Sequence, residues 1–228
     1  MPIINLIYNA PRSWKPSSNT IVYYNIDSND TPTTIYDHSW NNNTLSWWNF
    51  TYVTDSSAWR VYQWWNYSTL PSTNIIDFWQ TFTFIAWVKY SSSSPWTIFA
   101  NGATSSTHPS NCLNYWGNSL MWWASWVNDS SRTVSYSSTI QTWVWLMIAY
   151  TRDSNGNLNL YQNNSQVATN TVSSSVVYPW WQFMLGWWRV GDVWPLNWYL
   201  KVLIWENKAR TVDEITAYYN RSKENYWL

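Results

Sequence analysis

The sequence predicts an all-β fold, an antiparallel β-sandwich of the jelly-roll type with one short helix near the C-terminus. Two observations predict it. Short runs in which apolar and polar residues alternate recur along the chain and are separated by polar turn sequences. A single segment with helical periodicity follows a helix-capping pattern close to the end. The 228 residues suit one domain of this kind.

The clearest strand is Thr81–Lys89, in which alternation places Phe82, Phe84, Ala86 and Val88 on one face. The remaining strand candidates share the same period of two, in shorter runs. They are Ile21–Ile26, Thr97–Ala100, Arg132–Ser137, Trp145–Thr151, Leu158–Tyr161, Val167–Thr171, Phe183–Leu185 and Tyr199–Trp205.

The sequence also predicts two turns and the start of one helix. The Asn-Gly pair within Asp153–Asn157 is the strongest short hairpin signal, and Asn163 and Asn164 join the next pair of strands, since Asn tolerates left-handed backbone. Thr211 with Glu214 three residues later forms a capping box. The residues after it place an apolar face at Ile215, Ala217 and Tyr218, which predicts a helix.

Charge and composition exclude several partners. Twelve basic and twelve acidic side chains give a formal net charge of zero, which argues against a nucleic acid or an anionic membrane surface. No run reaches the length of a membrane span, and the N-terminus lacks the pattern of a secretory signal. Residues 1–18, broken by three prolines, are expected to form an extended arm that docks on the domain or on a neighbouring subunit, or that packs loosely, with residues 19–228 as the domain.

Tryptophan is abundant and glycine is scarce, at 24 against 5 residues. Average usage would give about 16 glycines in a chain of this length. Many tryptophans stand beside Asn, Asp and Ser where a turn needs φ > 0, a conformation that glycine adopts freely and a bulky residue adopts with strain. Either the protein has an unusually tryptophan-rich surface, or some residues written as tryptophan are glycines at turns in the native protein.

Four motifs in order resemble one known family. They are the opening strand and loop (Val22–Asp27 and Asp37–Asn41), the Thr81–Lys89 strand, the hairpin through Thr142–Tyr150 and Leu160–Asn164, and the closing segment Asn197–Ile215. Over about residues 19–221 the chain resembles the laminin-G-like, concanavalin A-like lectin/glucanase jelly-roll family. The resemblance implies the sandwich fold and raises both glycan binding and glucanase activity as questions.

The resemblance divides the tryptophans into two groups. Trp87 and Trp145 match core positions where the family itself has Trp. Other tryptophans fall where the family has Gly, namely Trp40, Trp59, Trp79, Trp143 and Trp198, together with at least one member of each Trp doublet. We therefore interpret many tryptophans as UGA codons that the source organism decodes as glycine. True tryptophans there would require strained turns and exposed apolar surface.

Catalysis is not expected. A retaining glycosidase needs two carboxylates about 5–5.5 Å apart, yet no strand carries acidic residues two positions apart, and Glu206, Glu214 and Glu224 all lie near the C-terminus. His38 and His108 lie in expected loops, and the Ser and Asp residues near them form no arrangement that suggests a triad. We predict a protein that is not an enzyme.

Calcium is the strongest chemical candidate, because several members of the family bind structural calcium in the first loop. Asp27, Asn29, Asp30 and Asp37 supply oxygen ligands of the kind Ca²⁺ prefers. The alternative is that these side chains cap Asx turns. Lys201 stands where the family often has an acidic residue, which weakens any carry-over of ion chemistry to that strand.

For a glycan, the sequence offers amide, carboxylate and aromatic side chains in two expected loops, Asn101–Asn118 and Tyr178–Asn197. The candidates are Asn114, Tyr115, Asp192 and Asn197. Two functions remain open: a non-catalytic carbohydrate-binding or adhesion module displayed on a particle or cell surface, and a virion decoration or fibre protein with no sugar binding of its own. Both predict a virion or extracellular location.

Overall fold

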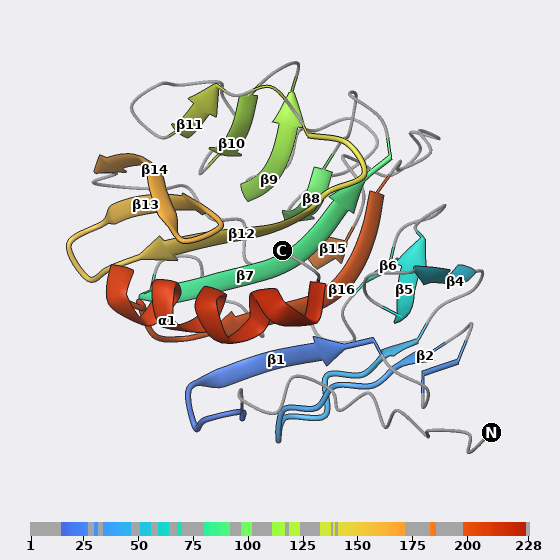
Figure 1. Cartoon of the computed structure of the whole chain (residues 1–228). Coiled ribbons are helices and arrows are strands. Elements are labelled where there is room, and N and C mark those ends of the chain that lie inside the picture. The colour runs from blue at the N-terminus through green and yellow to red at the C-terminus, as the bar shows by residue number, and fades with distance from the viewer. Residues whose placement is uncertain are drawn as a thin grey trace, which may run out of the picture.

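A computed structural model describes residues 15–26, 30–31, 34–46, 51–55, 59–63, 68–69, 80–91, 97–101, 111–116, 119–123, 133–137, 139, 141–171, 183–185 and 198–226. In this part of the chain the strands form two large antiparallel sheets and one short ribbon (Figure 1). The helix lies across the face of the larger sheet that is turned away from the second sheet. The predicted β-sandwich with one C-terminal helix is confirmed.

The larger sheet has eight strands in its described part. Its order is β14 (Ser165–Thr171), β13 (Asn157–Gln162), β12 (Trp145–Arg152), β7 (Phe82–Tyr90), β16 (Trp198–Glu206), β5 (Trp59–Gln63) and β4 (Thr51–Asp55), with β1 (Thr20–Asn25) also paired to β16. The second sheet runs β11 (Thr133–Ser137), β10 (Ser119–Trp123), β9 (Asn111–Trp116), β8 (Thr97–Asn101), β15 (Phe183–Leu185) and β6 (Ser68–Thr69). The ribbon pairs β2 (Thr34–Ile35) with β3 (Leu45–Ser46).

Strand β16 changes partners along one edge, and Lys201 lies at the change. Tyr199 and Leu200 pair with β5, whereas Val202–Glu206 pair with β1. The register against β7 shifts between Leu200 and Val202, which marks a β-bulge around Lys201. The Lys201 carbonyl accepts from Ile26 N at 3.0 Å, and its ammonium donates to the Ile26 carbonyl. The backbone and the side chain of Lys201 therefore both bind Ile26, the residue that follows β1.

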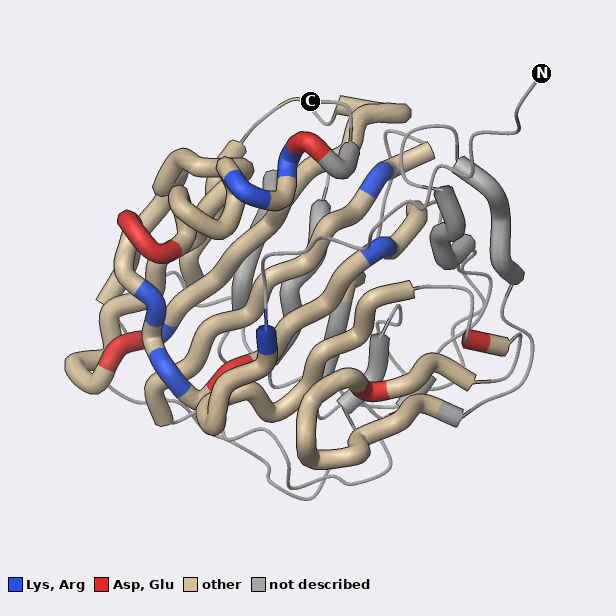
Figure 2. The backbone as a smooth tube through the Cα atoms, turned by 60° about the horizontal axis from the view of Figure 1, so that its bottom comes forward, with Lys and Arg blue, Asp and Glu red and all other residues tan. Residues whose placement is uncertain are grey.

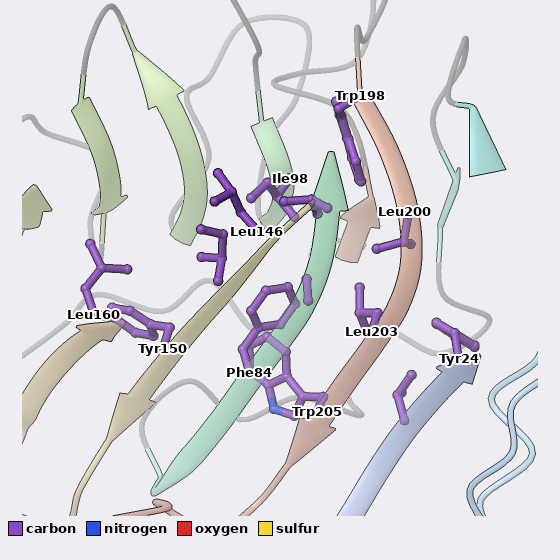
Figure 3. Close-up of a cluster of buried hydrophobic side chains, with 14 of the residues drawn as sticks. Tyr24, Phe84, Ile98, Leu146, Tyr150, Leu160, Trp198, Leu200, Leu203 and Trp205 are labelled. Carbon is purple, nitrogen blue, oxygen red and sulfur yellow. The ribbon is translucent and has the colours of Figure 1, made fainter. Parts of the chain in front are cut away.

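The predicted inner face of β7 packs against the second sheet. Phe82, Phe84, Ala86 and Val88 are buried in one apolar cluster that includes Ile98 from β8 (Figure 3). Within it the rings of Phe82 and Trp205 stack at 5.0 Å between centroids. Alternation alone predicted which face of the strand is covered, and the burial confirms that prediction.

The outer face of the same sheet is covered by α1 (Val212–Ser222), which continues into a 3₁₀ turn, η2 (Lys223–Tyr226). Ile215 and Tyr218 pack against this face, and Tyr219 stacks on Trp87 at 5.8 Å. All nine residues of β7 are buried for this reason. Trp87 and Trp145 are core residues as predicted, but they lie beneath the helix side of the sheet and not between the sheets.

The start of the helix is held as the sequence predicts. Thr211 Oγ1 accepts from Glu214 N at 3.3 Å, and Glu214 Oε2 accepts from Thr211 N at 2.9 Å, which completes the capping box. Just before it, Arg210 Nη2 donates to Glu206 Oε1 at 2.9 Å. The Glu206 side chain is only 1% exposed, so this ion pair fixes the end of β16 to the helix from within the fold.

Several strands escaped prediction: β4, β5, β9, β10 and the short β2, β3 and β6. Their sequences are rich in Asn, Ser, Thr and Trp and lack clear alternation, as in Asn-Cys-Leu-Asn-Tyr-Trp of β9. The loop expected over Asn101–Asn118 was therefore wrong, since β9 occupies Asn111–Trp116. These strands form through pairing with neighbours and not through a local pattern.

The tryptophans thought to replace glycine behave in different ways. Trp143 has φ 63°, and the other described residues with positive φ are Asn42, Gly156 and Asn163. Its side chain is 61% exposed, and that of Trp40 is 74% exposed. Strain and exposure thus coincide at Trp143, where the family resemblance places a glycine.

Trp198 differs from the turn position expected for it. It opens strand β16, pairs with Tyr90 and is fully buried in the inter-sheet cluster. Trp59 likewise opens β5, and Trp122 and Trp123 end β10. Trp79 and the other four Trp doublets lie outside the described residues.

Candidate functional site

The first loop is organised by the carboxylate of Asp37. Its Oδ1 accepts from the backbone N–H groups of Tyr23 and Ser39, each at 2.9 Å. Its Oδ2 accepts from Ser39 Oγ at 2.6 Å and from Asn43 N at 2.8 Å. Both oxygens therefore serve donors of the loop itself, which is the Asx-type arrangement and leaves Asp37 a poor fit for a calcium ligand in this conformation.

Neighbouring side chains hold the same loop against β1. Asn41 Nδ2 donates to the Thr20 carbonyl at 2.7 Å, and Asn43 Nδ2 donates to the Ile21 carbonyl at 2.9 Å. Asp30 is buried, and its Oδ1 accepts from Tyr36 N at 2.8 Å. The loop is thus built by hydrogen bonds between its polar side chains and the backbone.

The calcium site stays a prediction. Asp27 and Asn29 lie outside the described residues, so the structure does not bring the four proposed ligands together. Among the residues that are described, no group of three or more His, Cys, Asp or Glu side chains is arranged to hold a metal ion.

The four expected sugar-binding residues are not assembled by the described structure either. Asn114 and Tyr115 lie on β9, where they pair with Met121 and Leu120 of β10. Asp192 and Asn197 lie outside the described residues. These two pairs stay a prediction, with the first pair now placed on a strand of the second sheet.

A row of three side chains on the outer face was missed at the sequence level. Trp145 of β12 pairs in register with Lys89 of β7, and Lys89 pairs with Tyr199 of β16. Lys89 Nζ lies 5.5 Å from the Trp145 ring centroid and 5.4 Å from the Tyr199 ring centroid, so the ammonium contacts two aromatic rings. Burial lowers the pKa of Lys89. The available signal was a lysine on the otherwise apolar face that carries Ile85 and Trp87.

Trp143 extends this row toward solvent. Its ring centroid lies 6.1 Å from that of Tyr199 at an interplanar angle of 44°, and its backbone N–H donates to the Tyr90 carbonyl at 2.7 Å. Tyr90 follows Lys89 directly in β7. The four residues Lys89, Trp143, Trp145 and Tyr199, named here the outer-face row, therefore form one cluster, in which Lys89 and Trp145 are buried and Trp143 is exposed.

Like Asp37 and Asp30, the carboxylates of Glu206, Glu214 and Asp153 are used by the fold. Glu206 binds Arg210, and Glu214 binds Lys208 and caps the helix. Burial raises the pKa of Asp153, but hydrogen bonds from Asn157 and Asn155 outweigh it, so the pKa is lowered overall. Contacts of this kind stabilise a fold, and they occupy the oxygens that an acid–base pair would need.

Basic and acidic positions are interspersed over the described backbone (Figure 2), and the basic ones do not gather in one area. This agrees with the formal net charge of zero. In the described part of the chain, no helix combines the length and apolar character needed to cross a membrane.

The comparison with known families is decisive at the level of the fold. A family described as the concanavalin A-like lectin/glucanases superfamily, of the laminin G type, matches residues 65–216, about two thirds of the chain. The chain belongs to this superfamily. The resemblance seen in the sequence motifs is confirmed, and no curated protein sequence matches the chain significantly.

Several solved structures that share this fold belong to toxins. The binding domain of Paraclostridial Mosquitocidal Protein 1 matches with a TM-score of 0.67 at 12% identity, over 89% of this chain and 52% of that one. The binding domain of botulinum neurotoxin DC, solved in complex with SialylT, matches with a TM-score of 0.63 at 14% identity, over 89% and 51%.

A structure of botulinum neurotoxin type C, reported with the finding that cell entry depends on two ganglioside molecules, matches with a TM-score of 0.60 at 16% identity, over 89% and 51%. The chain therefore spans about half the length of these binding domains. At such identities the likeness shows the fold.

Proposed function

We propose that this protein is a non-catalytic carbohydrate-binding module. The observation that supports it most is that its superfamily fold is shared, over 89% of the chain, with toxin binding domains, two of which are described with a sialylated ligand or gangliosides. Fold alone does not transfer function, so the chain's own side chains must support it as well.

The placement of the carboxylates supports binding without catalysis. Glycoside hydrolysis of the common kind needs one carboxyl group as acid and a second as base or nucleophile. Glu206 is paired with Arg210 inside the fold, and Glu214 is held by Lys208 and the helix N-terminus. Neither is positioned to act on a sugar. We expect no turnover of β-glucans.

The proposal is tested on a glycan array with the purified chain and two loop variants. Asp192→Ala and Asn197→Ala are expected to weaken binding if the loops around them hold the sugar, as the sequence predicts. Asn155→Ala is the matched control, because Asn155 is an exposed residue of the β12–β13 hairpin. A protein that binds no glycan on the array contradicts the proposed function.

We further propose a particle or cell surface as the location, with residues 1–18 as an arm that attaches the domain to a neighbouring subunit. The alternative is a virion decoration or fibre protein that binds no sugar. Deleting residues 1–18 is expected to release the domain from particles in co-sedimentation. Unchanged co-sedimentation would contradict a role of the arm in attachment.

Trp143 supports a proposal about decoding. Among the described residues, the other positions with positive φ hold Asn or Gly, and Trp143 is strained and exposed at a position where the family resemblance implies Gly. We propose that some of the printed tryptophans, Trp143 foremost, are glycine in the protein made by its own organism.

A further inference from the structure

Strand β1 forms an edge of the larger sheet, and the first loop runs along it (Figure 1). On one side β1 pairs with β16. On its other side, in the described part of the chain, the pairing with strands is limited to the single bridge between Tyr24 and Asp37. An open strand edge is a template for pairing with another chain, and native proteins cover such edges. The sequence of β1, Thr-Ile-Val-Tyr-Tyr-Asn, favours strands and carries no charge that would repel a partner strand.

The first loop binds both backbone groups of Tyr23 in the middle of this edge. The Tyr23 N–H donates to Asp37 Oδ1 at 2.9 Å, and the Tyr23 carbonyl accepts from His38 N at 2.8 Å. In an antiparallel ladder, a residue exchanges both of these bonds with one residue of the partner strand. The Asp37 carboxylate and the His38 N–H therefore take the place of a partner strand at Tyr23.

Side chains of the same loop bind the carbonyls nearer the start of β1. Asn41 Nδ2 donates to the Thr20 carbonyl at 2.7 Å. Ser39 Oγ and Asn43 Nδ2 donate to the Ile21 carbonyl at 3.1 Å and 2.9 Å. The loop thus supplies, from short polar side chains, hydrogen bonds of the kind that a neighbouring strand would supply from its backbone.

One carboxylate couples this cover to the shape of the loop. Asp37 Oδ1 accepts from Ser39 N as well as from Tyr23 N, and Asp37 Oδ2 accepts from Ser39 Oγ and Asn43 N. Ser39 and Asn43 are the residues whose side chains bind Ile21. Bonds to an ionised carboxylate are stronger than bonds between neutral groups. Loss of this carboxylate therefore releases the loop from β1 at several points together.

We propose that residues 37–43 are an edge guard, which prevents β1 from pairing with a second copy of this chain. A second copy is the partner because two β1 edges related by a two-fold axis would pair antiparallel with each other, so that one surface serves both molecules. Such pairing would join the larger sheets of the two molecules into one. This inference goes beyond the proposed function, since it concerns assembly of the domain and not its ligand.

The experiment compares Asp37→Ala with the matched control Asp153→Ala. The Asp153 carboxylate also organises its own turn, by accepting from Asn155 N at 2.8 Å and from Asn157 N at 2.9 Å. That turn joins β12 to β13, two strands that are paired with each other, so its loss uncovers no strand edge. Sedimentation at rising protein concentration measures self-association. Hydrogen exchange measures the protection of the Tyr23 amide, and circular dichroism shows whether each variant is folded.

We expect the wild type and Asp153→Ala to sediment as monomers, and Asp37→Ala to form dimers in a fraction that rises with concentration. The self-association of Asp37→Ala should be tighter than that of the wild type by about tenfold or more. Its Tyr23 amide should exchange faster than in the wild type at low concentration and regain protection as dimers form. A double variant, Asn41→Ala with Asn43→Ala, keeps Asp37 and should also associate, and it decides the question if Asp37→Ala does not fold.

Equal self-association of the wild type and a folded Asp37→Ala overturns the edge guard. If the Tyr23 amide then exchanges rapidly, an open edge does not pair with a second copy. If that amide stays protected, residues other than Asp37 close the edge. Equal association of Asp37→Ala and Asp153→Ala also overturns the proposal, because the cause is then the loss of any turn carboxylate and not the uncovering of β1.

Discussion

Replacing Trp143 separately by glycine and by alanine measures the strain at that position. Trp143 has φ 63°, in the left-handed region, where a β-carbon meets the following carbonyl oxygen. Both substitutions delete the same indole, including its contact with Tyr199, so the loss of apolar contact cancels in the comparison. The difference between the two variants then reports the backbone alone.

The magnitude follows from two opposing effects. A residue with a β-carbon costs about 1–2 kcal/mol in left-handed backbone. Glycine loses about 0.5–1 kcal/mol more conformational freedom than alanine on folding. Trp143→Gly is therefore expected to be more stable than Trp143→Ala by about 1 kcal/mol, which for a domain of this size raises Tm by about 2–4 °C.

Val144 provides the matched control, because it is also partly exposed and has no positive φ. Here the order should reverse, with Val144→Gly less stable than Val144→Ala by about 0.5–1 kcal/mol. Urea and thermal unfolding followed by circular dichroism measure both pairs. Equal stability of Trp143→Gly and Trp143→Ala would refute the strain argument.

The decoding proposal has its own readout in the intact mass of the protein from its native host. Each tryptophan decoded as glycine lowers the mass by the difference between an indolylmethyl group and a hydrogen atom. A native mass equal to the 27.2 kDa of the printed chain would show that every tryptophan is genuine, and would overturn the decoding proposal whatever the strain at Trp143.

Three further predictions concern charged side chains that the fold uses. Glu206→Gln should lower the free energy of unfolding by about 3 kcal/mol, because the substitution leaves Arg210 inside the fold without its charged partner. A loss under about 1 kcal/mol in urea unfolding would contradict the stabilising role of this ion pair. Asp37→Asn should lower the free energy of unfolding by about 1–3 kcal/mol, since an amide nitrogen cannot accept the bonds that Ser39 and Asn43 donate. The calcium site predicted for the same loop implies that added calcium raises the Tm of the wild type, and an unchanged Tm would contradict it. Burial raises the pKa of Glu214, but hydrogen bonds from Lys208 and Thr211 outweigh burial and lower the pKa overall. The stabilisation by Glu214 is therefore present above the unfolded pKa of about 4.3 and is lost as pH falls through the lower folded pKa. Glu214→Gln should make the free energy of unfolding fall less steeply at acid pH, and an unchanged pH dependence would contradict this role of Glu214.

Local patterns predicted those parts of the fold that local physics controls. The inner face of β7, the hairpin at Asn155-Gly156 and the capping box at Thr211 all depend on residues within a few positions of each other. Their structure agrees with the sequence because alternation, positive φ and helix capping are short-range effects.

Strands without a clear alternation of apolar and polar residues could not be predicted from local patterns. Strand β9 lies in a segment that was expected to be a loop, β10 was not predicted, and the two strands pair with each other. Trp198 looked like a turn residue and is buried at the start of β16, because pairing with Tyr90 directs its side chain into the inter-sheet interior. Neighbours that are distant in the sequence decide both cases.

The sequence by itself determined the all-β class, the superfamily and the helix, because each depends on residue type and short spacing. Only the tertiary structure decided which face of the larger sheet receives each tryptophan and which strand meets which. The outer-face row shows why. Lys89, Trp145 and Tyr199 are 56 and 54 residues apart along the chain, and strand register alone brings them side by side.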